Sequence, residues 1–251
     1  MTARNLGFIT ERKIAHRGLH DKAKGVIENT AGAFSAAIAG GFAIECDVQL
    51  SQDGEAMVVH DFHLDRLTTG TGKVIDRTAA ALAAIPMRGT TDRIGTLGDM
   101  FSLVAGRTLI VCEIKSAFNG DMRLTSRVAD VARAYAGPLV IKSFDPRIVE
   151  HWHRLNTGIP VGIVAMNDYT YPDYETLSAA EKHALANLLH FPLSRPDFIS
   201  WRVRDLPSGV PFLCRRALGL PTMAWTVRSP GDVELAKAHA DQMVFEGFLP
   251  R

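Results

Sequence analysis

Several features that mark common protein classes are scarce or missing in this chain of 251 residues. Its three cysteines, Cys46, Cys112 and Cys214, form no CxxC pair, which argues against a disulfide-stapled secreted scaffold and a cysteine-bound zinc site. Cys46 and Cys112 fall in strand-like runs, where buried free thiols are common. No apolar run approaches the roughly 20 residues of a membrane helix, and residues 1–12 do not resemble a signal peptide. We therefore expect a cytoplasmic protein with no stable membrane association.

An excess of charge of either sign is also missing. The chain has 28 Lys and Arg residues against 27 Asp and Glu residues, a formal net charge of +1. A protein that binds nucleic acid or an anionic membrane through its surface normally carries a basic excess, so we expect neither as its main partner. A small anionic partner could still be recognised, but only by a few locally placed cations.

What is present is a regular alternation of strand-like and helix-like segments. Short apolar runs, expected as strands, occupy residues 13–16, 43–50, 108–114, 139–143, 160–165, 197–201, 222–227 and 241–246. Stretches with helical periodicity occupy 30–39, 97–104, 123–135, 146–155, 179–189 and 232–238. About eight strand–helix units in one chain of this length predict an α/β protein, a closed (β/α)8 or TIM barrel, and no GxGxxG motif follows the first run as a dinucleotide-binding sheet would require. We expect one domain over residues 1–251.

The alternation is interrupted once, between residues 51 and 94. This segment has an extra apolar run at 56–60, turn-rich residues at 68–72, and a weak helical stretch at 79–85 that ends before Pro86. The segment is too short to form a separate domain. We expect a small insertion after the second strand, lying over one side of the barrel mouth.

Two predicted strands carry charged residues at alternate positions. Glu45 and Asp47 point to one face of their strand, whereas Cys46 points to the other. Glu113 and Lys115 repeat this arrangement in the third strand, near the rim where barrel enzymes carry their catalytic groups. Three carboxylates converging there would suit one divalent cation, Mg²⁺, Ca²⁺ or Mn²⁺, rather than Zn²⁺. Solvated or ion-paired carboxylates are the alternative interpretation.

Two histidines lie at strand-to-loop junctions. His16 ends the first predicted strand and precedes Arg17, and His60 ends the inserted apolar run and precedes Asp61. With a metal, an arginine and a lysine nearby, such a pair would suit a general acid and a general base acting on a phosphate; alone, each would be an ordinary hydrogen-bonded loop residue. Asp61 would either orient His60 or cap a turn. The histidines with no such setting, expected at the surface, include His20, His63, His151 and His153.

These residues belong to a longer ordered set of motifs. The set is His16-Arg17-Gly18, Glu28-Asn29-Thr30, Ala33-Phe34, Glu45-Cys46-Asp47-Val48, Asp53-Gly54, His60-Asp61, Leu64-Asp65-Arg66, Thr68-Thr69-Gly70, Gly72, Glu113-Ile114-Lys115, Lys142-Ser143-Phe144-Asp145, Val161-Gly162 and Trp225-Thr226-Val227. In type and order it resembles the signature of the glycerophosphodiester phosphodiesterase family. The resemblance is densest over residues 13–78, thins downstream, and covers nearly the whole chain.

The resemblance implies a fold, an activity and roles for individual residues. Family members are (β/α)8 barrels with a small insertion after the second strand, and they hydrolyse glycerophosphodiesters to sn-glycerol 3-phosphate and an alcohol. By position, His16 and His60 match the catalytic histidines. Arg17 and Lys115 match the phosphate-contacting cations. The carboxylates that match the ligands of one divalent cation, Mg²⁺ or Ca²⁺ with Mn²⁺ as a further candidate, are Glu45, Asp47 and Glu113.

Two aromatic residues and two departures bear on the substrate. Phe144 and Trp225, at strand ends, are expected either to form an apolar wall for the glycerol carbons or head group, or to pack as core. The last strand ends in Phe245-Glu246-Gly247-Phe248 where many members carry a Thr-Asp pair, and Arg228 stands where Asn is frequent. These departures leave substrate preference open. Whether the protein forms a homo-oligomer is also left open by the sequence.

Two other activities are compatible with the same barrel. A phospholipase-like enzyme would cleave lysophospholipids by attack of a substrate hydroxyl. A catalytically silent barrel would only bind a phosphodiester. Related lipid-cleaving enzymes are usually secreted and disulfide-bearing, which this chain does not resemble, and a pure binding protein has no use for two proton-transfer groups.

Overall fold

Eight parallel strands pair in a closed ring, because the first strand contacts both the second and the last. The computed structural model describes residues 6–250. The strands of the barrel are β1 (Ile14–Ala15), β2 (Ala43–Leu50), β4 (Ile110–Ile114), β5 (Leu139–Ser143), β6 (Val161–Ala165), β7 (Phe198–Arg202), β8 (Thr222–Val227) and β9 (Gln242–Phe245). The predicted (β/α)8 barrel is thereby confirmed.

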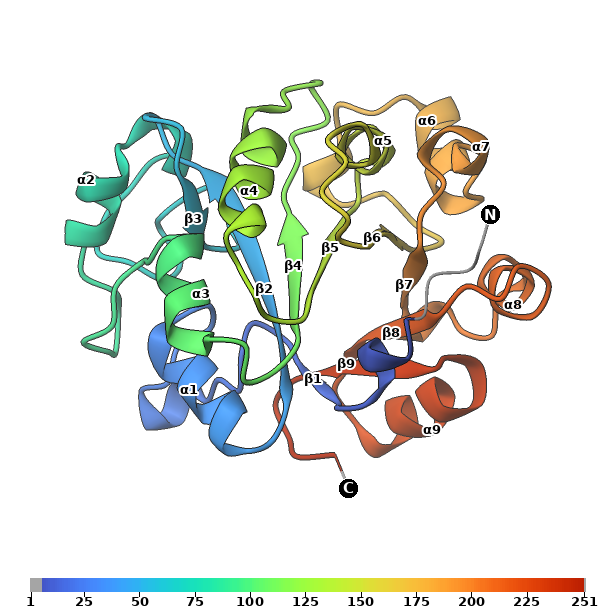
Figure 1. Cartoon of the computed structure of the whole chain (residues 1–251), viewed down its shortest axis with the longest axis horizontal. Helices are drawn as coiled ribbons and strands as arrows, with labels where there is room; N and C mark the ends of the chain where they lie inside the picture. Colours follow the sequence, from blue (N-terminus) through green and yellow to red (C-terminus); the bar gives the residue numbers. More distant parts are fainter. Residues whose placement is uncertain (1–5, 251) are drawn as a thin grey trace.

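Helices surround this ring of strands, as Figure 1 shows. They are α1 (Ala31–Ala39), α3 (Leu97–Val104), α4 (Arg123–Arg133), α5 (Pro146–Arg154), α6 (Ala179–Ala186), α7 (Phe191–Ser194), α8 (Gly209–Arg216) and α9 (Pro230–His239). Several begin at the side-chain caps that the sequence supplies. Thr96 and Asp99 form a reciprocal capping box at α3, and Asp145 caps α5, whose first residue is Pro146. Such caps satisfy amide groups that the first turn leaves unpaired.

The inside of the barrel is divided into an apolar floor and a charged upper layer. Ile14, Val111, Val140 and Val244 are among the inward side chains of the floor, and Ile9 of the short 3-10 helix η1 (Gly7–Thr10) joins them. Two residues further along the same strands, the inward positions become charged, since side chains two apart share a face. The floor is therefore packed, and the charged inward side chains lie toward the carboxyl ends of the strands, where barrel enzymes carry their catalytic groups.

A glycine makes room for the largest side chain of the floor. A Cβ atom built on Gly162 of β6 would lie only 2.4 Å from the ring of Phe198 on the neighbouring strand β7. Any side chain at position 162 would therefore displace this ring from the barrel interior.

The insertion expected after the second strand is present on one side of the barrel, where Figure 1 shows it in teal. β3 (Ala56–Val58) runs antiparallel to the outer part of β2, and η3 (Val74–Asp76) and α2 (Ala79–Ala84) follow. Buried side chains that include Met57, Leu64 and Leu82 give the segment a small core of its own. This core supports the loop that carries His60 to the mouth of the barrel.

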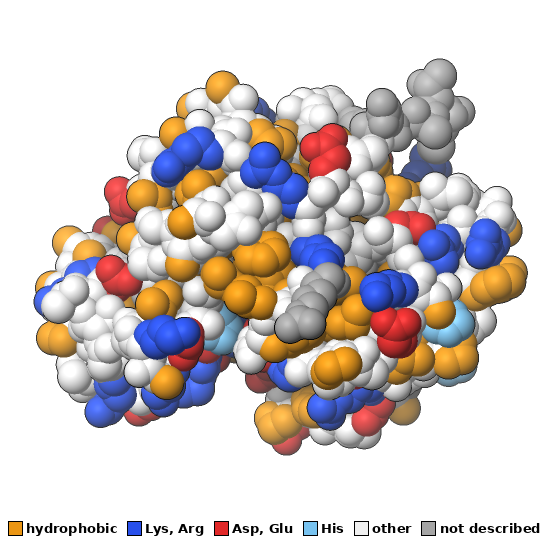
Figure 2. All heavy atoms as spheres, turned by 90° about the horizontal axis from the view of Figure 1, so that it is seen from below, with side chains coloured by type: hydrophobic (Ala, Val, Ile, Leu, Met, Phe, Trp, Pro, Cys, Tyr) orange, Lys and Arg blue, Asp and Glu red, His pale blue; other side chains and the backbone are white. Residues whose placement is uncertain are grey.

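The outer surface carries both signs of charge. On the face shown in Figure 2, basic and acidic side chains are interspersed among apolar ones, consistent with the net charge of +1. No helix within residues 6–250 is long and apolar enough to cross a membrane.

Candidate active site

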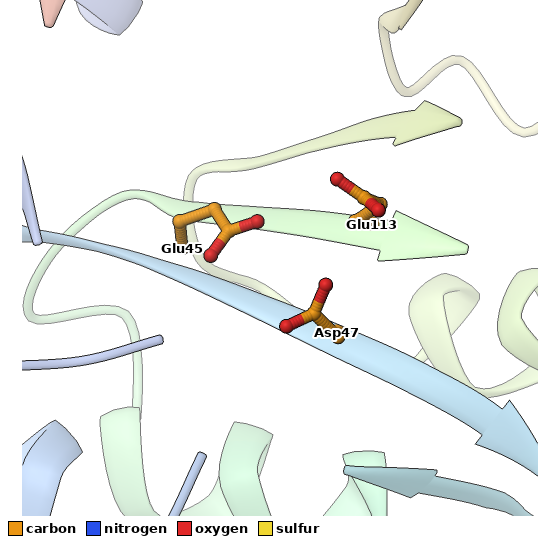
Figure 3. A group of neighbouring side chains, drawn as sticks. All are labelled: Glu45, Asp47 and Glu113. Atoms are coloured by element: carbon orange, nitrogen blue, oxygen red, sulfur yellow. The ribbon is translucent and has the colours of Figure 1, made fainter. Parts of the chain in front are cut away.

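Three carboxylates from two neighbouring strands meet inside the upper part of the barrel. Glu45 and Asp47 extend from β2 and Glu113 from β4, as Figure 3 shows. One oxygen atom from each lies within 4.8 Å of the other two, and all three residues are buried. Strand alternation brings them together because the register pairs Asp47 with Glu113, and it turns Cys46 outward into the layer between strands and helices.

Three cations balance these carboxylates. The Nε atom of Arg17 is 3.3 Å from Asp47 Oδ2, and the Lys115 ammonium lies 2.8 Å from Asp47 Oδ1 and also contacts Glu113. Lys142 on β5 lies between the other two acids, 2.9 Å from Glu45 Oε1 and 3.1 Å from Glu113 Oε2. The cluster therefore contains three acidic and three basic side chains, in a place where an isolated charge would be very costly.

The ionisation of these groups follows from their charged neighbours. Burial alone would raise the pKa of Asp47, but the charges of Lys115, His60 and Arg17 hold it well below its usual value. Burial would likewise raise the pKa of Glu113, but Lys115 and Lys142 lower it to about 2. Both carboxyl groups are thus ionised at neutral pH, as cation ligands must be.

The arrangement fits a hard divalent cation. Its donors are carboxylate oxygens close enough to share one ion, a set that suits Mg²⁺, Ca²⁺ or Mn²⁺. The residues present therefore fit the metal that was expected.

His60 is oriented by its neighbour in sequence. Its Nδ1 atom lies 2.7 Å from Asp61 Oδ1, which decides between the two roles expected for Asp61. Arg66 contacts Asp61 through Nε at 2.5 Å and donates two bonds to Glu28, which in turn accepts a bond of 2.6 Å from Arg17. A chain of charged groups thus connects the inserted segment to the loop after β1.

His16 is held by the last strand of the barrel. Its Nδ1 atom contacts Glu246 Oε2, and its Nε2 atom is 3.9 Å from Glu45 Oε2. Glu246 also contacts Arg228 at 2.6 Å and His20 at 3.6 Å. The expectation that His20 lies at the surface is wrong, because its Nε2 atom is buried beside this carboxylate.

Many of these groups line one cavity of about 670 Å³, a size typical of small-molecule sites. Its lining includes His16, Arg17, His60 and Lys115. Phe144 and Trp225 form part of its wall, with ring centroids 5.4 Å apart and planes at 90°. Both also contact the buried cluster around Tyr174, so they pack against a core while facing the cavity.

The sequence interpretation missed three residues of this site. Lys142 shares the inward face of β5 with Phe144, and a lysine inside an otherwise apolar strand was a signal that could have revealed it. Glu246 was noticed only as a departure from the family pattern. The third is Asn29, whose amide donates a bond of 3.0 Å to Asp47 and accepts one of 3.2 Å from the Asp47 backbone.

Comparison with known proteins finds relatives in sequence and in fold. A glycerophosphodiester phosphodiesterase of Caldanaerobacter subterraneus is 40% identical over 111 residues, which cover 41% of this chain and 44% of that protein; the match thus spans less than half of that relative. A phosphodiesterase of Oleispira antarctica, solved with its product sn-glycerol-3-phosphate, superposes with a TM-score of 0.76 at 20% identity over 94% of this chain and 92% of its own. A glycerophosphodiester phosphodiesterase of Thermotoga maritima superposes with a TM-score of 0.69 at 24% identity over 92% of each chain.

These two structural likenesses concern the fold, while the sequence family is identified by a family model. The model of the glycerophosphoryl diester phosphodiesterase family matches residues 16–246, from the first site histidine to the last site carboxylate. The chain therefore belongs to the glycerophosphoryl diester phosphodiesterase family.

Proposed function

We propose that this protein hydrolyses glycerophosphodiesters to sn-glycerol 3-phosphate and an alcohol. The observation that carries the proposal is that His16 and His60 line one cavity together with Asp47 and Glu113 of the buried carboxylate cluster. That combination provides for proton transfer and for charge stabilisation at a single phosphate. The product bound by the structurally similar Oleispira enzyme is the product expected here.

Glu45, Asp47 and Glu113 would hold one divalent cation, Mg²⁺, Ca²⁺ or Mn²⁺. When bound, such an ion supplies Lewis-acid polarisation of a phosphoryl oxygen. Asn29 holds the Asp47 carboxylate in place from the side through its amide. One of the three proposed ligands is thus held by the fold before any ion binds, as hydrogen bonds from surrounding residues commonly do in metal sites.

Arg17 and Lys115 are proposed to receive the phosphate. Both line the cavity, where Arg17 offers a planar fork and Lys115 a compact charge. Arg17 is held by Glu28, so its guanidinium is positioned before substrate binds. The two cations would stabilise the negative charge that accumulates on the non-bridging oxygens in the transition state.

His16 and His60 are proposed to exchange the protons. Each ring has its Nδ1 atom turned to a carboxylate, Glu246 or Asp61, so Nε2 is the atom available to the substrate. One histidine would take the proton of the attacking oxygen, and the other would protonate the departing alkoxide. Phe144 and Trp225 would contact the glycerol carbons or the head group.

A coupled assay for glycerol 3-phosphate tests the proposal. It would be run on several glycerophosphodiesters, on a lysophospholipid, and with and without chelator. Release of glycerol 3-phosphate that stops in chelator is the expected result. Turnover of the lysophospholipid alone would indicate the phospholipase-like activity, and binding of phosphodiesters without turnover would indicate a silent barrel; either would overturn the proposal.

A further inference from the structure

The two lysines in the carboxylate cluster differ in how far they can move. Both line the cavity, but the Lys115 side chain is 13% exposed and the Lys142 side chain only 2%. The register of β4 and β5 places Lys142 directly beside Glu113, and Val140 of the apolar floor lies two residues below it on the same face. Lys115 can turn toward a substrate, but Lys142 has no comparable freedom.

Lys142 also contacts two of the acids at once. Its ammonium lies 2.9 Å from one of these carboxylates and 3.1 Å from the other. A fixed positive charge therefore contacts two of the three oxygen donors expected to bind the metal.

We propose that Lys142 is a built-in counter-ion of the metal site, which keeps Glu45 and Glu113 together without metal and lowers the affinity of the site for divalent cations. The inference rests on the proposed metal site and goes beyond it, since the roles proposed above do not involve Lys142. A positive charge beside the donors reduces the attraction that they exert on a second cation. The same charge relieves the repulsion between buried carboxylates when no metal is bound.

Removal of the charge should have two opposite effects. In Lys142→Met, which keeps most of the length of the side chain without its charge, and in Lys142→Gln, the Kd for Mg²⁺ should fall by about tenfold or more relative to the original chain. Without metal, the Tm of both variants should be lower, because the carboxylates lose a counter-ion. Saturating Mg²⁺ should reduce or remove this deficit in Tm, since it restores positive charge at the same place.

The experiment is isothermal titration of the full, chelator-stripped chain with MgCl₂, together with thermal unfolding at zero and at saturating Mg²⁺. Lys22→Gln is the matched control, because Lys22 is exposed and its loss changes the net charge equally; its Kd should stay within about twofold, since distant exposed charges are screened.

Unchanged or weaker Mg²⁺ affinity in both Lys142 variants would overturn the inference, as would a Tm deficit that Mg²⁺ does not reduce. Failure of both variants to fold at any Mg²⁺ concentration would assign Lys142 a purely structural role and would also overturn it. The proposed function is tested separately by the original chain. If its activity is lost in chelator while the variants show no gain in affinity, only the role of Lys142 is wrong. If activity survives exhaustive chelation, the proposed metal chemistry is wrong.

Discussion

The carboxylate of Asp61 lies 2.7 Å from Nδ1 of His60, so two residues adjacent in sequence form an oriented pair at the mouth of the barrel. The contact leaves the second ring nitrogen of His60, Nε2, for the proposed proton transfer. Arg66 holds the same carboxylate from the other side, which fixes the orientation of Asp61 in turn.

Asp61→Asn should therefore lower kcat by about 10–10³-fold, because the amide cannot stabilise a protonated His60 as the carboxylate does. Substrate binding should change little, since Asp61 is not among the proposed phosphate contacts. The measurement is a pH profile of kcat and KM for the variant. Asp65→Asn, which removes an exposed acid from the same cavity, should stay near the original rate. Equal losses in the two variants would contradict an orienting role for Asp61.

Metal removal should abolish turnover. Exhaustive dialysis against EDTA is expected to stop the release of glycerol 3-phosphate, and Mg²⁺, Mn²⁺ or Ca²⁺ should restore it. Replacement of Glu45, Asp47 or Glu113 by Ala should weaken metal binding, measured by titration, and should lower the turnover rate by orders of magnitude. Full activity of the metal-stripped protein would show that the three carboxylates serve another purpose.

The two histidines should behave as one acid–base unit. His16→Ala and His60→Ala should each lower kcat by about 10²–10⁴-fold, and the double variant should lose much less than the product of the two losses. A substrate with a p-nitrophenol leaving group separates the roles, because it needs no protonation as it departs. Activity on it should survive loss of the acid far better than loss of the base. Equal damage on both kinds of substrate would exclude a dedicated leaving-group acid.

Cys46 and Cys112 should be structural. They are neighbours across β2 and β4 and are fully buried on the face opposite the carboxylates. Burial also raises the pKa of Cys46 well above its usual value, so it remains an unreactive thiol. Cys46→Ala or Cys112→Ala should lower the free energy of unfolding by roughly 1 kcal/mol or more, without changing the rate per folded molecule. Inactivation by a thiol reagent that substrate prevents would disprove this.

His190, which precedes α7, should make stability depend on pH. Burial lowers the pKa of His190 from 6.5 to about 4, so the unfolded chain binds a proton at a pH where the folded protein does not. The contribution of neutral His190 to the free energy of unfolding is therefore complete above pH 6.5. The free energy of unfolding falls as the pH drops toward 4, by at most about 1.4 kcal/mol per pH unit.

The measurement for His190 is urea denaturation at several pH values between 7.5 and 5, approximately the window above the titration of the acidic groups. His190→Asn, which cannot ionise, should show a weaker loss of stability than the original chain over this range. The same slope for both proteins would mean that another group dominates.

Much of this protein could be predicted from its sequence because the relevant patterns are local. Alternation along a strand is enough to place Glu45 and Asp47 on one face and Cys46 on the other, and strands β2, β5 and β8 have the predicted bounds. α8 (Gly209–Arg216) was not predicted, since Gly209 and Pro211 near its start obscure the helical pattern. The inherent preferences of these residues oppose a helix, and packing against β7 and β8 outweighs them.

Contacts between distant segments were decided by the tertiary structure alone. Glu246 reaches His16 across 230 residues of sequence, because closure of the barrel brings β9 beside β1. Lys142 meets Glu45 and Glu113 only because the strands are staggered so that their inward side chains share one layer. The periodicity of a sequence determines which face a side chain occupies, whereas its partner on that face depends on strand register and ring closure, which involve the whole chain.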